Sequence, residues 1–389
     1  MVFPLGALGM LLVRIGFAVH GAGMARSKNS AGAVMRQLCD LCVAVLAFWA
    51  VGYAILSSGN SVFGLQWRSL FGTADSDSGA VGFAAAVLIA TGIVPGVLAE
   101  RARFWPTLAT SALLAALVIP VAALWTHGGW LSNWGFHDIG GAGWLHLPGA
   151  LCAAAGAYYV GPRTGKFNRD GSSTAIPGHS LPLAGIGVVF LLVGFFLFVG
   201  IQSGAAAMNV LLAASAGGLA SVIFSQLRYY KPDIHLTYAG IVGGMVAISA
   251  GADIVPGIAA VVIGAVAGVI VPLSILLLDV KVRIDDPSGG ISVHGVGALW
   301  GLIAGPILAR GMTIGQRFKF LGVHLLGIIA ISILTLAFSI ALWSLLKRVT
   351  KLRASEADEF DGLDLAEHDI GAYPDFQQTT IKSYHLREM

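Results

Sequence analysis

The sequence has little charge and little cysteine. Only 11% of its 389 residues are charged, against about 25% in a soluble domain, which argues against a water-soluble fold. Three cysteines are too few for a disulfide framework. Cys39 and Cys42 form a C-x-x-C pattern without a second Cys or His pair nearby, so we interpret them as packing residues rather than a metal or redox site. The formal charge of +3 is too small to indicate nucleic-acid binding.

Long apolar runs dominate the chain instead. Hydrophobic residues make up 56% of the sequence and 52 residues are glycine, which membrane helices use more freely than soluble ones. Because ~20 apolar residues cross a hydrocarbon core of ~30 Å, we predict an all-α polytopic membrane protein with eleven spans. The apolar N-terminus lacks a basic n-region and is interpreted as the first span rather than a signal peptide. The expected spans are 3–23, 39–58, 79–99, 104–125, 141–161, 182–202, 205–226, 235–251, 255–279, 291–309 and 319–346.

The loops alternate in basic content, which predicts the orientation. Those that follow odd-numbered spans carry most of the loop Lys and Arg residues. The loops after even-numbered spans carry only Arg68, Arg310, Arg317 and Lys319. By the positive-inside rule the first set lies in the cytoplasm. We therefore expect an integral protein of the cell (inner) membrane, with its N-terminus outside and its C-terminus cytoplasmic, which an odd number of spans requires.

Two charged residues fall inside expected spans. Arg14 lies in the middle of the first span and Asp40 near the inner end of the second, and an intramembrane charge is a functional hypothesis by default. Their expected depths differ by roughly two to three helical turns, so we do not expect a direct ion pair. The alternative is that Asp40 reaches interfacial water while Arg14 snorkels or faces other protein.

An internal repeat contains two histidines. Asp138 precedes His146 and Asp286 precedes His294 by eight residues each, and both histidines open an H-x-x-G-A-L phrase. The copies occupy the fifth and tenth spans, which enter the membrane from opposite sides. This pattern predicts an inverted 5+5 repeat plus a long eleventh helix, with the functional site between the repeats near the middle of the bilayer.

Each acidic residue of the repeat lies just before its helix. A carboxylate there can accept hydrogen bonds from free backbone N–H groups, so Asp138 and Asp286 are expected to be structural residues near a pore. The two imidazoles, brought together, could hydrogen-bond each other and line a passage. The alternative for each histidine alone is a hydrogen-bonded packing residue.

At these residues the sequence resembles the ammonium transporter family (Amt/MEP/Rh), as a divergent microbial Amt-like member. The resemblance covers nearly the whole chain. The motifs that carry it are Gly21–Asn29, Ala99–Phe104, Asp138–His146, Asp285–Val296 and Gly362–Tyr373.

The resemblance implies a homotrimer in which each protomer has its own narrow pore for ammonium or ammonia. His146 and His294 would be the paired pore histidines, Phe198 the inner of two occluding phenylalanines, and Phe195 a pore-lining aromatic residue. Trp125 would lie at an outer recruitment site, with Ser203 as the recruitment hydroxyl. Trp130, Trp134 and Trp144 are interpreted as an interfacial belt.

Several positions depart from the family pattern. Ala86 stands at the expected outer gate phenylalanine, with Phe83 one turn earlier as a substitute, and His20 replaces a pore-side aromatic residue. These changes leave a second function open. The first is a transporter or channel that deprotonates ammonium and conducts ammonia, and the alternative is an ammonium-binding membrane sensor with little or no transport.

The remaining predictions concern the domains and partners. Residues 1–350 are expected to form the membrane domain and residues 351–389 a cytoplasmic tail. The family likeness of Gly362–Tyr373 implies a docked regulatory segment and a P-II signalling protein as partner, and the alternative is a loosely ordered tail. We find no nucleophile–base constellation or metal-ligand cluster, so we expect neither an enzyme nor a cofactor or metal.

Overall fold

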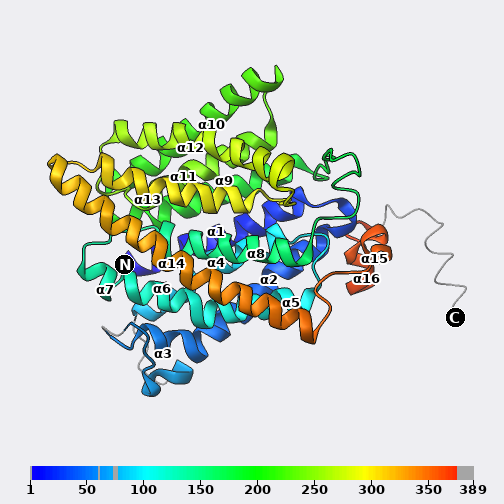
Figure 1. The fold of residues 1–389 in the computed structure, drawn as a ribbon, viewed down its shortest axis with the longest axis horizontal. Helices are drawn as coiled ribbons and strands as arrows, with labels where there is room; N and C mark the ends of the chain where they lie inside the picture. Colours follow the sequence, from blue (N-terminus) through cyan, green and yellow to red (C-terminus); the bar gives the residue numbers. More distant parts are fainter. Residues whose placement is uncertain (1, 60–61, 73–77, 375–389) are drawn as a thin grey trace, which may run out of the picture.

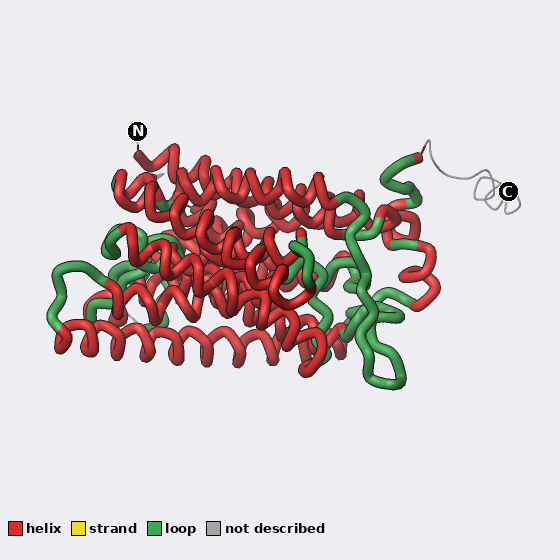
Figure 2. The backbone as a smooth tube through the Cα atoms, turned by 90° about the horizontal axis from the view of Figure 1, so that it is seen from above, coloured by secondary structure: helices red, strands yellow, loops and turns green. Residues whose placement is uncertain are grey.

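Helices account for nearly all of the chain. The computed structural model describes residues 2–59, 62–72 and 78–374. Within these ranges β-structure is limited to two isolated bridges. The long helices lie side by side along the long axis of the molecule, and α15 and α16 lie at the end opposite the start of α1 (Figure 1). A view turned by 90° shows the same layers, with loops gathered at both ends (Figure 2).

The helical segments follow the order of the expected spans. Several are interrupted by π-helical turns, named η. The segments are α1 Val2–Met24; α2 Ser30–Ala47 with η2 Phe48–Gly52 and α3 Tyr53–Leu56; α4 Ser78–Val97; α5 Phe104–Leu113 with η4 Leu114–Val118 and α6 Ile119–Thr126; η5 Ala142–His146 with α8 Leu147–Val160; α9 Leu181–Phe198; α10 Gly204–Tyr229; α11 Ile234–Ser249; α12 Gly257–Leu277 with η7 Leu278–Val282; η8 Ile291–Val296 with α13 Gly297–Leu308; and α14 Ile314–Val349. Short helices α7 Trp130–Asn133, α15 Glu356–Asp361 and α16 Leu363–His368 lie in the connections and the tail.

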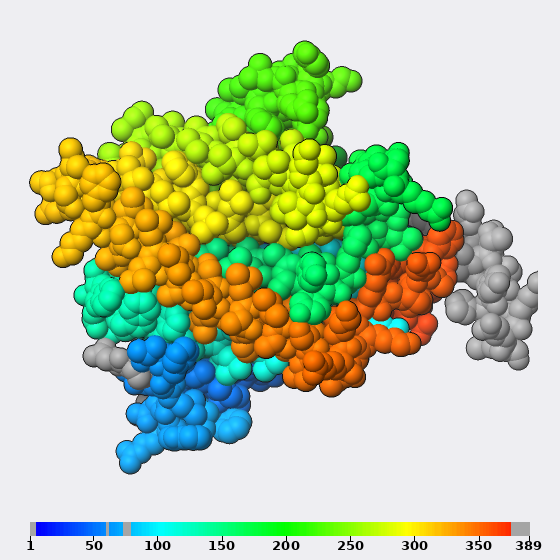
Figure 3. All heavy atoms as spheres, in the orientation of Figure 1, coloured from blue at the N-terminus to red at the C-terminus, as the bar shows by residue number. Residues whose placement is uncertain are grey.

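The membrane architecture is confirmed, while the number of spans stays a prediction. Among the described residues, nine helical stretches are long and apolar enough to cross a bilayer, and Ile234–Ser249 is a shorter apolar helix. The segment Ala142–Val160, where the fifth span was expected, is helical but is not one of the nine. Helix α14, the last of the nine, is the longest helix among the described residues, at 36 residues. It crosses the visible surface obliquely toward the tail (Figure 3).

The second span begins earlier than expected, at Ser30 rather than residue 39. The polar residues in this stretch suggested a loop, but the fold buries them. Arg36 donates to the carbonyl of Ala102, with Nη1 and O 2.6 Å apart. Gln37 donates from Nε2 to the carbonyl of Gly92 at 3.0 Å. Because these side chains find partners on neighbouring segments, the helix can include them without exposing polar atoms to lipid.

The expectation that Arg14 and Asp40 do not pair is wrong. Arg14 Nη2 lies 2.5 Å from Asp40 Oδ2, and both side chains are buried. Helix α1 ends at Met24 and α2 begins at Ser30, so each charge lies about ten residues, or roughly 15 Å, from the turn between them. The early start of α2 therefore brings the two residues to the same depth.

The Arg14 guanidinium has further partners. It donates to the carbonyl of Gln37, and its Nη1 lies 3.2 Å from the carbonyl of Leu88. These bonds join α1, α2 and α4 in the interior of the bundle. A buried ion pair with such additional bonds is tolerated because its desolvation is compensated by a fixed set of partners.

Helices α1 and α9 approach closely because glycines face each other. A Cβ added to Gly9 would lie 2.6 Å from the backbone nitrogen of Phe198, and one added to Gly194 would lie 2.7 Å from the carbonyl oxygen of Gly9. Small residues allow membrane helices to pack backbone against backbone. This contact holds the part of α9 that carries Phe195 and Phe198 against the first helix.

The two ends of the bundle differ in composition, and we name them for use below. The basic face comprises the connections that follow α1, α4, α8, α10, α12 and α14, together with α15 and α16. The aromatic face is the opposite end. It carries α7 and the segments around Trp125 and Phe63.

The buried ion pair yields a stability prediction. We expect Asp40→Ala to lower the free energy of unfolding by about 3–5 kcal/mol, because it leaves the Arg14 guanidinium uncompensated in the interior. Thermal unfolding of the purified protein in detergent measures this change.

The matched control is the double variant Arg14→Met with Asp40→Leu, which removes both charges and keeps apolar volume. We expect it to recover most of the lost stability. A double variant as unstable as Asp40→Ala would contradict the interpretation.

Candidate functional site

Two carboxylates organise the two helix starts that carry the repeated histidines. Asp138 accepts hydrogen bonds from the backbone N–H groups of Ala142 at 2.8 Å and Gly143 at 2.6 Å. In the other copy Asp286 accepts from Gly290 at 3.1 Å and Ile291 at 2.7 Å. Each carboxylate thus satisfies donors at the start of η5 or η8 that have no intrahelical partner. The backbones of η5 and η8 are thereby able to begin inside the bundle.

The histidines of the two copies meet in the interior. His146 Nδ1 and His294 Nδ1 lie 3.1 Å apart, and their rings are nearly parallel, with centroids 5.0 Å apart. His146 is fully buried and His294 is 4% exposed. One Nδ1 must donate a proton and the other must accept it, so the rings are held in opposite tautomers when both are neutral.

Aromatic rings flank this pair on both sides. Phe195 stacks on His146 with ring centroids 5.4 Å apart and an angle of 11° between the planes. Phe17 meets His294 edge-on at 5.4 Å. Phe198 is buried one turn beyond Phe195 on α9. The imidazoles therefore lie in a predominantly apolar enclosure.

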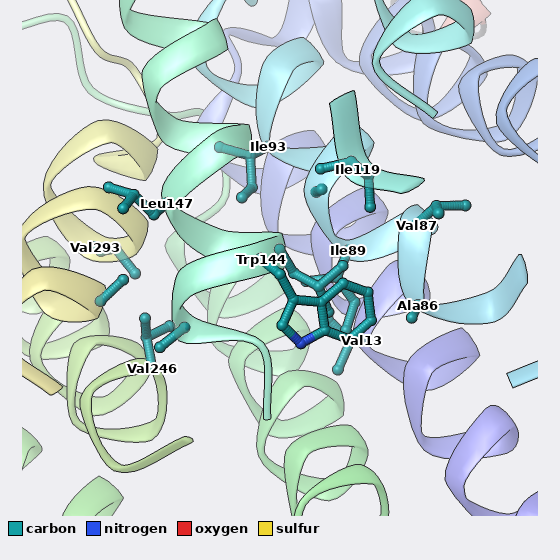
Figure 4. Close-up of a cluster of buried hydrophobic side chains, with 14 of the residues drawn as sticks. Val13, Ala86, Val87, Ile89, Ile93, Ile119, Trp144, Leu147, Val246 and Val293 are labelled. Atoms are coloured by element: carbon teal, nitrogen blue, oxygen red, sulfur yellow. The ribbon is translucent and has the colours of Figure 1, made fainter. Parts of the chain in front are cut away.

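Aliphatic side chains from several helices complete the enclosure. Figure 4 shows Val13, Ile89, Ile93, Val246 and Val293 gathered with Leu147 and Trp144 in one buried cluster. Leu147 and Val293 are chain neighbours of the two histidines. The Nε2 atom of His146 is buried and has no protein partner among the described residues. The arrangement can therefore offer a hydrogen bond to a small polar molecule inside an otherwise apolar core.

Comparisons with known proteins identify the family. The sequence matches the Ammonium Transporter Family over residues 1–373. The chain belongs to the ammonium transporter family. The family comprises membrane transporters rather than enzymes, as expected from the sequence.

Individual relatives support this membership along the whole chain. Ammonium transporter Amt2 of Archaeoglobus fulgidus is 35% identical over 94% of this chain and 86% of its own length. Ammonium transporter Amt2 of Methanocaldococcus jannaschii is 31% identical, with coverages of 96% and 91%. Among solved structures, the Sensor Amt Protein is similar with a TM-score of 0.90, 30% identity and coverages of 94% and 97%. Mep2 of Saccharomyces cerevisiae, at 24% identity, shares the fold with a TM-score of 0.78 over 91% of this chain and 86% of its own.

An aromatic cluster lies on the side of the histidine pair toward the aromatic face of this transporter-family bundle. Phe83 contacts His127 with ring centroids 5.2 Å apart and Trp144 at 5.6 Å. The rings of His127 and Trp144 lie 4.6 Å apart. Ala86 is buried one turn further along α4. Trp144 and His146 belong to the same π turn, so this cluster is connected directly to the histidine pair.

Sequence reasoning missed two members of this cluster. Trp144 was expected in an interfacial belt, but it is only 3% exposed. The sequence did contain a signal for Trp144, which lies two residues before His146. Residues of one helical turn lie at a similar depth in the membrane, so Trp144 could have been expected near the histidine pair. His127 carried no recognisable signal in the sequence alone.

Two of the expected recruitment residues make other contacts. Trp125 is buried and donates from Nε1 to the carbonyl of Val62 at 2.6 Å, and its ring packs against Phe63 and Trp130. Ser203 is exposed, and its hydroxyl accepts from the backbone N–H of Ala206, which caps the start of α10. The structure thus brings Phe83 into contact with Trp144, which shares a π turn with His146, while it engages the polar groups of Trp125 and Ser203 elsewhere.

Metal binding has no support in the described part of the chain. Residues 2–59, 62–72 and 78–374 contain no group of three or more His, Cys, Asp or Glu side chains suited to a metal ion. Cys39, Cys42 and Cys152 are free thiols.

An ion pair on the aromatic face involves loop residues outside the spans. His137 Nε2 lies 2.9 Å from Asp253 Oδ1. Burial opposes protonation of His137, but the hydrogen bond and the charge of Asp253 outweigh it and raise the pKa of His137. Burial likewise opposes ionisation of Asp253, yet the bond to His137 lowers its pKa. The pair ties the loop before η5 to the connection between α11 and α12.

This ion pair predicts a pH-dependent contribution to stability. The contribution of His137 is complete below its unfolded pKa, about 6.5, and is lost as pH rises through its raised folded value. The contribution of Asp253 is complete above its unfolded pKa, about 3.9, and is lost as pH falls through its lowered value. We therefore expect His137→Gln to lower the melting temperature most near pH 5–6 and least in alkaline solution.

The control is His179→Gln. His179 lies on the basic face, where its Nδ1 bonds the carbonyl of Ala25. Melting curves of both variants and the wild type between about pH 4 and 9 provide the measurement. A difference for His137→Gln that grows steadily toward high pH would contradict the assigned pair.

Proposed function

We propose that this protein transports ammonium by binding the cation on the aromatic face, removing a proton, and conducting ammonia past His146 and His294. The observation that carries the proposal is the Nδ1–Nδ1 contact of 3.1 Å between two buried histidines. Each histidine comes from a separate copy of the Asp–His motif. Membership of the ammonium transporter family supports the substrate.

The electrostatics of the interior favours the neutral species. Moving a charged group to the centre of a bilayer costs at least ~2.5–3.5 kcal/mol even on lenient scales. The surroundings of the histidine pair are apolar and aromatic, so they offer little compensation to a permanent cation. Ammonium can lose a proton and avoid this cost, whereas potassium cannot. A narrow apolar passage therefore discriminates between cations of similar size.

The paired imidazoles suit the passage of ammonia. A neutral imidazole has one donor and one acceptor nitrogen, and ammonia has three N–H donors and one lone pair. Because the Nδ1 atoms bond each other, the Nε2 atoms are left to interact with a ligand. The pair can therefore replace hydrogen bonds that ammonia loses when it leaves water, and it can relay the released proton.

We propose that Phe83 contributes the cation-binding ring on the aromatic face, together with Trp144 and His127. Aromatic faces attract a cation by about 0.5–2 kcal/mol. The direct ring contacts of Phe83 with Trp144, which shares a π turn with His146, support this assignment. Trp125 and Ser203 stay predicted members of the outer recruitment site, and Phe198 a predicted inner gate.

The predicted orientation follows from the charges of the loops. We propose that the aromatic face is external and the basic face cytoplasmic in a cell (inner) membrane, in line with the positive-inside rule. Residues 1–350 would form the membrane domain of a homotrimer with a pore in each protomer. The matching Asp caps of η5 and η8 support the proposed inverted repeat.

The specific structural likeness to the Sensor Amt Protein favours a second candidate function. With Ala86 at the expected gate position, the alternative is a membrane sensor that binds ammonium and conducts little or none. The two functions differ in flux rather than in binding.

The function is tested by flux through purified protein in proteoliposomes. We expect an ammonium gradient to drive uptake in the wild type, and His146→Ala or His294→Ala to reduce it more than tenfold, because each removes one half of the hydrogen-bonding pair. Methylammonium uptake in a transporter-deficient host provides a second measurement.

The control for these variants is His179→Ala, which removes an imidazole from the basic face. Unchanged uptake and selectivity in both pore variants would refute the histidine mechanism. Ammonium binding without flux in the wild type would favour the sensor.

The first part of the tail is docked on the basic face. Asp364 accepts from the backbone N–H groups of Ala31 and Gly32 at 2.9 and 2.7 Å, which caps the start of α2. Glu367 forms an ion pair with Arg36. Glu359 accepts from Arg353 at 2.5 Å and from both the backbone and the hydroxyl of Thr164.

We propose that these contacts make the segment regulatory, because it bonds to α2 and to the connection after α8, which links the two halves of the bundle. Residues 351–389 would form the cytoplasmic tail, and a P-II signalling protein is the predicted partner. The part from residue 375 onward lies outside the described residues.

Docking of the tail predicts protection from protease. Trypsin should cut wild-type protein slowly after Lys351 and Arg353, because the following helices are held against α2. We expect Asp364→Ala to accelerate this cleavage several-fold, since it removes both N-terminal bonds to α2.

The matched control is Asp361→Ala, which removes an exposed carboxylate from the same tail. Gel analysis of timed digests measures the rates. Equal rates for the two variants would show that the Asp364 contact does not hold the segment.

A further inference from the structure

A small cavity lies between the histidine pair and the basic face. It has a volume of about 40 Å³ and is lined by Phe17, His20, Gln37, His235, Tyr238 and His294, among others. A cavity needs roughly 10–15 Å³ by this measure to hold one water molecule. The space is therefore large enough for a molecule of the size of water or ammonium together with a bridging water.

Two wall residues have buried polar atoms that the protein leaves without a partner among the described residues. Gln37 donates from Nε2 to the carbonyl of Gly92 at 3.0 Å, and its Oε1 is buried without a partner among the described residues. The side chain is only 3% exposed. His235 Nε2 is also buried and unpartnered within the same residues.

The tautomer of His20 follows from its own hydrogen bond. Its Nδ1 lies 3.1 Å from the carbonyl oxygen of Ala184. Because a carbonyl oxygen can only accept, Nδ1 must carry the proton, and Nε2 of the neutral ring is an acceptor. His20 thus adds a third acceptor to the cavity, and its ring lies edge-on to Tyr238.

Two hydroxyl donors in the same wall are already engaged. Tyr238 donates its hydroxyl proton to the carbonyl of Leu181 at 3.1 Å. Ser288 donates to Asp286 Oδ1 at 3.2 Å. The cavity therefore offers acceptors at Gln37 Oε1, at His20 Nε2 and, when the proton of its neutral ring is on Nδ1, at His235 Nε2, so it can bind a ligand rich in N–H or O–H groups.

The nearby charges are compensated by pairs. Arg14, which bonds the backbone of Gln37, is paired with Asp40. On the basic-face side, Asp285 is paired with Arg163. Burial alone would raise the pKa of Asp285, but the bonds from Arg163 and the charge of Arg101 lower it to about 2. These two ion pairs therefore place no uncompensated charge of their own beside the acceptors of the cavity.

We propose that this cavity is a binding site for ammonium, formed by Gln37, His20 and His235 on the basic-face side of the histidine pair. Ammonium carries four N–H donors, and the three residues line one cavity of suitable size, with Gln37 Oε1 and His20 Nε2 as acceptors and His235 Nε2 as a third when its ring is protonated on Nδ1. The inference rests on the proposed conduction path, because ammonium would occupy this site when it enters or leaves from the basic face. Neutral imidazole and amide acceptors distinguish it from the aromatic site at the other end.

Three variants test the site. His20→Phe and His235→Phe keep a ring but remove the acceptor nitrogen. Gly21→Leu fills the cavity, since Gly21 lines it and a Cβ at this position meets no atom within 4 Å. Leucine also suits the helical position better than glycine, so this variant is expected to fold. His179→Phe is the control, because it removes an imidazole that bonds a carbonyl outside the cavity.

The measurement is ammonium flux in proteoliposomes of one orientation, with ammonium supplied from either face. From the basic face we expect the half-saturating ammonium concentration to rise by about tenfold in His20→Phe and His235→Phe, which is the effect of losing one hydrogen bond to a charged ligand. We expect it to rise in Gly21→Leu as well, because the leucine side chain occupies the space of the ligand. From the aromatic face we expect the wild-type value. Unchanged half-saturation from the basic face in all three variants would overturn the proposal.

A binding measurement separates this inference from the proposed function. Absence of flux in the wild type would refute transport, and calorimetric titration of ammonium chloride into the detergent-purified protein then decides the site, with potassium chloride as the salt control. Weaker ammonium binding in His20→Phe and Gly21→Leu than in His179→Phe supports the site. Equal binding in all of them refutes it.

Discussion

The contact between the Nδ1 atoms of His146 and His294 is the interaction on which the rest of the site depends. It requires two helix starts to reach the interior of the bundle, where unpaired backbone N–H groups are costly. Asp138 and Asp286 satisfy these groups, and each does so through both carboxylate oxygens. The carboxylates would therefore act on the proposed pore through the position of the histidines rather than by contact with a ligand.

The same constraint governs the other polar groups of the interior. Arg14 and Asp40 are tolerated because they meet at one depth and because the Arg14 guanidinium also donates to backbone carbonyls of α2 and α4. Gln37 lines the inner cavity and bonds Gly92 through its amide nitrogen, while its Oε1 is buried without a partner among the described residues. Helix α2 thus carries both Asp40 of the buried ion pair and Gln37, which lines the candidate site. Changes in the ion pair are expected to be felt at the cavity, because Arg14 is bonded to the carbonyl of Gln37.

Much of this arrangement could be predicted from the sequence. The repeated Asp–His spacing identified both histidines. The position of Asp138 and Asp286 just before apolar runs indicated that their carboxylates cap the helix starts. The ion pair between Arg14 and Asp40 could not be inferred. The polar residues before residue 39 indicated a loop, so the second span was predicted to begin there rather than at Ser30. Those residues find partners on other helices, and single-sequence hydropathy does not register tertiary hydrogen bonds. The prediction for Trp144 was wrong for a related reason. From sequence alone, a tryptophan near the end of a span in an interfacial belt cannot be distinguished from one buried in the protein core.

The sequence of environments along the path explains how one protein could select and release the same ion. The Phe83, His127 and Trp144 cluster offers ring faces, which attract a cation while still close to water. The histidine pair lies in an apolar enclosure that penalises charge and still provides hydrogen bonds. In the proposed inner site, Gln37 Oε1 and His20 Nε2 are again acceptors, which would favour the protonated form. Charge is therefore disfavoured only in the middle of the path, where the two repeated motifs meet. Potassium would be attracted at the first of these environments and stopped at the second, since it has no proton to leave behind.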